Sequence, residues 1–137
     1  MEEKNNNMKE FTTQISTTRE QSERLLALGL NPETADLMWD AITVFRGKEV
    51  EEPRWSLRTW YYPHKSGFLR DDEEQTFIPS WSLHRLLIMC DSDVQTDGHY
   101  FSLPHYGFTE HDNIFDNICD CIEWLIQEGK FNKEYLV

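Results

Sequence analysis

TEHDNIFDNICDCIEWLIQEGKFNKEY, residues 109–135, is the stretch that decides the fold, because it predicts one long amphipathic helix. Thr109 or Asp112 is expected to cap the first turn of this helix, and Gly129 follows its last periodic residue, where a left-handed C-terminal cap is common. Apolar residues recur at the spacing of one helical face: Ile114, Ile118, Cys121, Ile122 and Leu125. The helix therefore supplies one side of a hydrophobic core.

The opposite face of the same helix is polar and acidic, and it includes Asp116, Asn117, Asp120 and Glu123. We interpret it as a solvated face, since charges along one side of a helix usually contact water. Trp124 lies at the border between the two faces, about 40° from Asp120 on a helical wheel. A tryptophan there either covers the edge of the core or anchors a partner.

The composition of the 137 residues indicates a single globular domain. Hydrophobic residues make up 39% and aromatic residues 13%, which is too much for a disordered chain. No apolar run approaches the roughly 20 residues needed to cross a bilayer, and the first residues lack the pattern of a signal peptide. Cys119 and Cys121 would point to nearly opposite sides of a helix and cannot pair with each other. We therefore expect a reduced, cytoplasmic protein without membrane contact.

The net charge of −12 comes from 13 basic and 25 acidic residues. Such a field repels duplex nucleic acid, which we do not expect as a partner. The charge suits solubility or a basic protein partner. It also allows an acidic mimic that blocks a nucleic-acid-binding protein, which we keep as an alternative function.

The remaining sequence predicts an α+β domain, with a small antiparallel sheet packed against three to four helices. The polar residues 1–16 predict a mobile tail, which leaves residues 17–137 as the domain. A helix is expected from Thr17 or Thr18 to Gly29, followed by a short helix over 32–40 that Asn31 caps. A charged connector (46–54), a strand (55–62), a loop (63–76), a core helix over 81–91 capped by Ser80, and a strand (99–103) complete the expected elements.

The predicted strand WSLRTWYY, residues 55–62, carries the surface that we expect to bind a partner. Alternation places Arg58, Trp60 and Tyr62 on one face of that strand. We predict that these three residues, with Trp124, bind another protein, and that the chain is an interaction or accessory protein and not an enzyme. An uncovered strand edge also allows a homodimer. The basic and aromatic residues of 54–70 leave single-stranded nucleic acid as a further alternative.

The sequence contains no nucleotide-binding glycine loop, no nucleophile elbow and no CxxC or HxxxH pair. We therefore expect no catalytic residue, no metal and no cofactor. The acidic loop that begins at Asp91 fails as a calcium site, because Thr96 and Ser102 replace the required Gly and Glu. A small metal-dependent enzyme that uses His105, His111 and Asp112 remains the alternative from a different class.

Several segments resemble a group of short, functionally uncharacterised bacterial proteins carried by phages and integrated mobile elements. These segments are TREQS (18–22), TAD (34–36), PSWSL (79–83) and DNIFDNICDCIEWLIQEG (112–129). The resemblance extends over about residues 17–136 and is most specific in the Trp-Ser-Leu helix start and in the last segment. It implies an accessory role in such a genomic setting and brings no catalytic residues with it.

Overall fold

The α+β class predicted from the sequence is confirmed by the computed structural model, which describes residues 14–47, 49–59, 70–90 and 94–137, without the side chain of residue 49. The strands form two antiparallel sheets of three, in the orders β2-β1-β3 and β4-β5-β6. The elements are α2 (Arg19–Ala27), the 3-10 turn η1 (Pro32–Thr34), β1 (Leu37–Arg46), β2 (Glu49–Thr59), β3 (Glu73–Ser80), α3 (Leu83–Cys90), β4 (Gln95–Asp97), β5 (Tyr100–Leu103), β6 (Gly107–Phe108), α4 (Ile114–Gln127) and the 3-10 turn η3 (Lys133–Tyr135).

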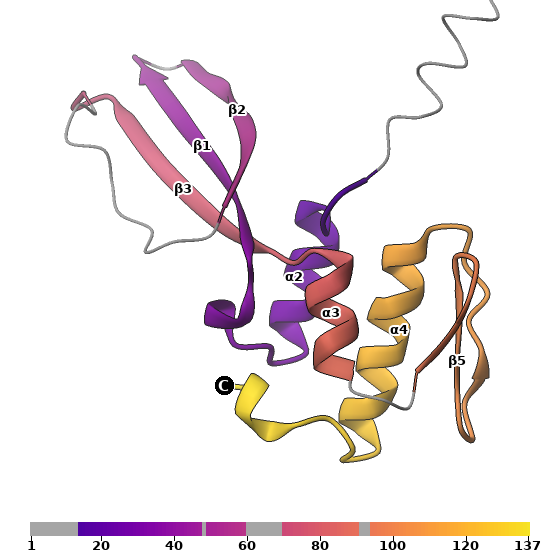
Figure 1. The fold of residues 1–137 in the computed structure, drawn as a ribbon. Coiled ribbons are helices and arrows are strands. Elements are labelled where there is room, and N and C mark those ends of the chain that lie inside the picture. Colours follow the sequence, from indigo (N-terminus) through magenta and orange to yellow (C-terminus); the bar gives the residue numbers. More distant parts are fainter. Residues whose placement is uncertain (1–13, 48, 60–69, 91–93) are drawn as a thin grey trace, which may run out of the picture.

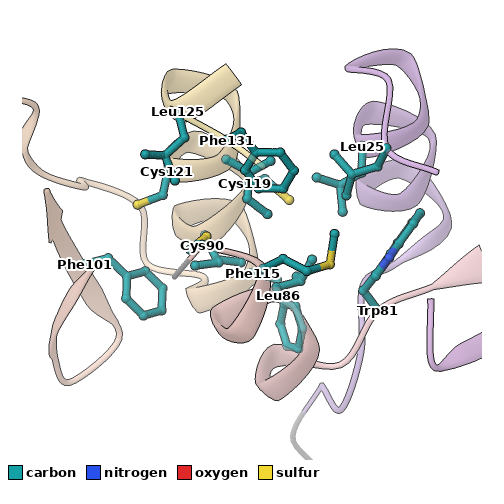
Figure 2. Packing of buried hydrophobic residues seen from close by; sticks show 14 of the residues in the cluster. Leu25, Trp81, Leu86, Cys90, Phe101, Phe115, Cys119, Cys121, Leu125 and Phe131 are labelled. Carbon is teal, nitrogen blue, oxygen red and sulfur yellow. The ribbon is translucent and has the colours of Figure 1, made fainter. Parts of the chain in front are cut away.

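The hydrophobic core lies among the three helices and the smaller sheet. Figure 2 shows Phe115 and Cys119 of α4 between Leu25 and Trp81 on one side and Phe101 of β5 on the other. The apolar stripe predicted for α4 is confirmed, because Ile118, Cys121, Ile122 and Leu125 are all buried. Burial of this stripe, and not local helix propensity alone, stabilises α4.

The start of α4 differs from the prediction. Asn113 caps the helix, since its Oδ1 accepts from the backbone N–H of Phe115 at 2.9 Å and of Asp116 at 3.1 Å. Thr109 is buried instead, and its Oγ1 accepts from the backbone N–H of Phe101 at 2.9 Å. Gly129 has the expected left-handed backbone, with φ at +69°. The side chain of Thr109 therefore joins β5 to the segment that precedes α4, while Asn113 caps the helix.

The predicted second helix over 32–40 is wrong. Only the single turn η1 forms there, and β1 begins at Leu37. β1 is the central strand of its sheet and is hydrogen-bonded to β2 on one side and to β3 on the other. Strand pairing on both edges, together with the β-branched run Ile42-Thr43-Val44, outweighs the helical spacing of the apolar residues before it.

The predicted strand 55–62 is confirmed as far as Thr59, and positions 60–62 lie outside the described residues. The strand begins earlier than predicted, because the expected connector 46–54 forms the turn and the first half of β2. Gly47, with φ at +61°, lies in the turn after β1. Pro53 of β2 lies at a register shift in the pairing, where a proline on an edge strand is tolerated. β3 likewise begins inside the expected loop 63–76.

The predicted cap of α3 is also corrected. Ser80 belongs to β3, and Ser82 begins the helix, because its Oγ accepts from the backbone N–H of Arg85 at 3.1 Å. The helix itself is confirmed over Leu83–Cys90.

The two sheets occupy different places relative to the helices (Figure 1). The β4-β5-β6 sheet lies beside α4, whereas the β2-β1-β3 sheet extends away from the helices and joins them only at its base. We call this larger sheet the projecting sheet. The described part of the chain has no helix with the length and apolar character that a membrane crossing requires.

Candidate functional site

The base of the projecting sheet is fastened by a buried hydrogen-bond network around Thr17. The backbone oxygen of Thr17 accepts from Trp39 Nε1 of β1 at 2.9 Å and from Ser80 Oγ of β3 at 2.8 Å. Its Oγ1 accepts from the backbone N–H of Trp81 at 3.0 Å and lies 2.8 Å from Ser22 Oγ of α2. Thr17 therefore connects β1 and β3 with α2 and fixes the base of the projecting sheet against the helices.

The strand register separates the projecting sheet into two chemically different faces. Directly opposite residues share a face, so Trp39, Ala41, Trp55 and Leu57 lie on one side. On that side, the guanidinium of Arg19 lies over the Trp55 ring, 4.5 Å from its centroid. The other side, which we call the open face, is formed by Asp40, Ile42 and Val44 of β1, Glu51, Glu52, Arg54, Ser56 and Arg58 of β2, and Glu73, Gln75 and Phe77 of β3.

The open face contains a hollow of about 340 Å³. Ile42 is 39% exposed there, although it lies on the central strand of the sheet. Val44 is opposite Glu51 of β2 and opposite Glu73 of β3. The site therefore combines uncovered aliphatic side chains with carboxylates on both neighbouring strands.

Arg58, the first residue of the predicted partner surface, lies on the open face as the alternation predicted. Its Nε is 3.1 Å from Oδ2 of Asp40, whose side chain is only 9% exposed. Gln75 Nε2 donates to Oδ1 of the same carboxylate at 2.9 Å. Arg58 therefore compensates a largely buried charge, so it has a structural role whether or not a partner contacts it.

The other residues of the predicted surface do not join Arg58. Trp60 and Tyr62 lie outside the described residues. Trp124 lies on α4, and Figure 1 places α2 and α3 between that helix and the projecting sheet. Its half-buried ring contacts the Tyr106 ring, with centroids 5.7 Å apart, and Lys130 Nζ lies 5.0 Å from its centroid. These contacts favour a place at the edge of the core, and partner binding by Trp124 stays a prediction.

The face of α4 predicted to be solvated packs against α2 through polar contacts instead. Arg24 Nη2 of α2 lies 2.7 Å from Asp120 and 3.2 Å from Glu123. Gln21 Nε2 donates to Asp116 at 2.7 Å. Asn117 is fully buried and binds backbone groups of residues 99 and 111. The interpretation failed because the sequence alone does not show that α2 offers complementary side chains at this position.

The structure gives no geometric support to a metal site at His105, His111 and Asp112. His111 Nε2 lies 2.7 Å from Asp120 Oδ2, which also belongs to the contact between α2 and α4. His105 is an exposed turn residue with φ at +69°. Within the described residues, His, Cys, Asp and Glu side chains form no group of three or more that could hold a metal ion.

The three cysteines are buried free thiols. Burial raises the pKa of both Cys119 and Cys121 to about 12, and it also raises the pKa of Cys90. A thiol must ionise to act as a nucleophile or metal ligand, so these cysteines behave as small apolar residues at neutral pH.

The arrangement of β2 also weakens the single-strand nucleic acid alternative. Arg54 and Arg58 lie on the open face, while Trp55 and Leu57 lie on the opposite face. A strand of nucleic acid that stacks on aromatic rings needs cations on the same side, and the cation on the side of Trp55 is Arg19, which already lies over that ring. Residues 60–69 of the predicted segment lie outside the described residues.

Comparison with known proteins finds no match to this chain among family models, curated proteins or solved structures.

Sequence reasoning missed Ile42, Val44, Glu51 and Glu73 as site residues. The reason is that the open face depends on β1, whose first residues had been assigned to a helix. The signal was present in the β-branched run Ile42-Thr43-Val44, which favours a strand, but the face that it forms becomes apparent only when the two neighbouring strands are known.

Proposed function

We propose that this chain is a non-enzymatic protein-interaction protein, and that the open face of the projecting sheet binds its partner. The observation that carries the proposal is the exposure of Ile42 at the centre of a three-stranded sheet that extends from the helical body. The uncovered face of an antiparallel sheet is ordinarily polar, so an exposed isoleucine on the central strand departs from that pattern. Exposed apolar residues with a polar rim around them mark surfaces that a partner can cover.

The same proposal includes an accessory role in a phage or an integrated mobile element, which rests on the sequence resemblance alone. The acidic-mimic alternative receives less support. Asp120 and Glu123 on α4 are paired with Arg24, and Gln21 binds Asp116, so these carboxylates do not form a free acidic row. A mimic of nucleic acid would present such a row to its target.

The proposal is tested by introducing a photo-crosslinking amino acid at position 42 in cells in which the protein is native. Phe108 provides the matched control, because it is 65% exposed on the other sheet. We expect a discrete protein adduct from position 42 and none from position 108. The same adduct from both positions, or an adduct from position 108 alone, would contradict binding through the open face.

Trp124 is tested separately, because it lies away from the open face. Trp124→Ala is expected to lower the melting temperature, since the ring packs against Tyr106 and contacts Lys130. Unchanged thermal stability together with loss of the captured protein would instead assign Trp124 to the partner surface, as the sequence predicted.

A further inference from the structure

We infer that the open face binds a protein segment in which an apolar side chain is flanked by lysine or arginine. The inference rests on the proposed function and specifies the chemistry of the partner. Ile42 and Val44 contact the apolar side chain, and Glu51, Glu52 and Glu73 attract the cations. The binding segment is therefore basic and amphipathic.

The apolar part of this chemistry follows from the floor of the hollow. Ile42 and Val44 lie two residues apart on β1, so both point to the same side of the sheet. The volume of about 340 Å³ is at the lower end of the roughly 300–1,000 Å³ found for ligand pockets. It suits one or two side chains of a bound segment better than a complete cofactor.

The basic part follows from the charges around that floor. Four carboxylates and two guanidiniums line the hollow, and the pair Asp40–Arg58 is already neutralised internally. Apart from that pair, the lining of the hollow contains three carboxylates and one guanidinium, that of Arg54. The three carboxylates belong to Glu51, Glu52 and Glu73.

Two of these three carboxylates lie near an arginine outside the hollow. Arg46 lies 3.7 Å from Glu51, and Arg70 lies 3.9 Å from Glu73. Both arginine side chains are mostly exposed, and long ion pairs to exposed cations contribute little. The Glu73 carboxylate is held more firmly than that of Glu51, because its side chain is only 20% exposed and its Oε1 also accepts from the backbone N–H of Arg70 at 3.1 Å. Glu52 forms no ion pair in the described part of the chain. An incoming lysine or arginine can therefore pair with Glu51 and Glu52 at small cost, while Glu73 adds its negative charge to the site.

A second copy of the chain fits this face less well. Each copy has a net charge of −12, so two open faces would bring like charges together. Pairing along the strand edges is also disfavoured, because Pro53 interrupts β2 and Pro79 lies near the end of β3. A positively charged partner meets neither obstacle.

The test titrates the isotope-labelled full-length protein with a synthetic amphipathic helix of leucine and lysine, followed by NMR. One control peptide replaces lysine by glutamate, and another replaces leucine by serine at equal charge. We expect the leucine–lysine peptide to shift the amide signals of Ile42, Val44, Glu51 and Glu73 and to bind roughly tenfold more tightly than the serine–lysine peptide. Added salt is expected to weaken the binding.

Two variants locate the binding on the open face. Ile42→Ser removes the apolar contact, and Glu52→Lys reverses a charge on the rim; each should weaken binding roughly tenfold. Glu74→Lys is the matched control, because it makes the same charge change on the other side of the projecting sheet, opposite Thr43. This control variant is expected to bind the peptide as the native chain does.

Equal effects of Glu52→Lys and Glu74→Lys, or equal binding of the serine–lysine peptide, would reduce the interaction to general charge attraction and overturn the inference. Binding of the leucine–glutamate peptide would overturn it as well. A concentration-dependent dimer that Ile42→Ser abolishes, without peptide binding, would assign the face to a second copy. If position 42 gives a crosslinked protein while the peptide does not bind, the proposed function stands and only the partner chemistry is rejected.

Discussion

Replacing Thr17 by valine is expected to destabilise the protein by about 2–4 kcal/mol, although the two side chains have nearly the same shape. Thr17 is fully buried. The variant loses the hydroxyl that accepts from the backbone N–H of Trp81 and contacts Ser22 Oγ. A buried N–H without a partner costs about 1–3 kcal/mol, and the lost contact to the serine hydroxyl adds about 1 kcal/mol. The backbone oxygen of residue 17 keeps its bonds to Trp39 and Ser80.

The assay is urea unfolding followed by tryptophan fluorescence, with Thr18→Val as the control. Thr18 also accepts a hydrogen bond, from the backbone N–H of Gln21, but it is exposed, so water can replace it. The control should therefore lose only about 1 kcal/mol of a helix cap. Thr17→Ser keeps the hydroxyl and should lose about 1 kcal/mol for the missing methyl group. If Thr17→Val is no less stable than Thr18→Val, the buried network does not hold the base of the sheet.

Three further predictions concern buried side chains and their partners. Asn117→Asp should cost about 3–5 kcal/mol at neutral pH, because a carboxylate would replace the amide that donates to two backbone carbonyls at 2.7 and 2.8 Å; stability equal to that of the native chain in urea would contradict this. Arg58→Ala should lower the free energy of unfolding by about 1–2 kcal/mol, because Asp40 loses its cation. The same substitution should cost much less in an Asp40→Asn background. Additive effects of the two substitutions in this double-mutant cycle would show that the pair is not coupled. The thiols of Cys119 and Cys121 have a pKa raised by burial to about 12 from 9.0, so the unfolded chain loses these protons first as pH rises. The contribution of these two thiols to stability should therefore be constant below about pH 9 and then fall by about 1.4 kcal/mol per thiol per pH unit up to about pH 12. A doubly alanine-substituted chain with the same decline would refute this cause.

The helices α2, α3 and α4 and their buried sides were accessible from the sequence because they depend on local periodicity, whereas the helix expected over 32–40 was wrong. The spacing of Ile118, Ile122 and Leu125 predicts the buried side of α4 without knowledge of any other element. The capping box of α2 was equally local: Thr18 and Gln21 lie three residues apart, and the structure contains both of its hydrogen bonds. The alternation of β2 from Trp55 to Thr59 placed Arg58 on the correct face for the same reason.

The tertiary structure decided the features that depend on what lies across from a residue. β1 is a strand because β2 and β3 bind both of its edges, which outweighs the helical spacing of Ala35, Met38 and Trp39. The carboxylates of α4 contact α2 because Arg24 and Gln21 reach them, so their interpretation as a solvated face was wrong. The open face exists only where three strands bring Ile42, Glu51 and Glu73 together. The spacing of apolar residues along the chain determines which side of a helix or strand is apolar, whereas the pairing of distant segments determines whether that side is covered.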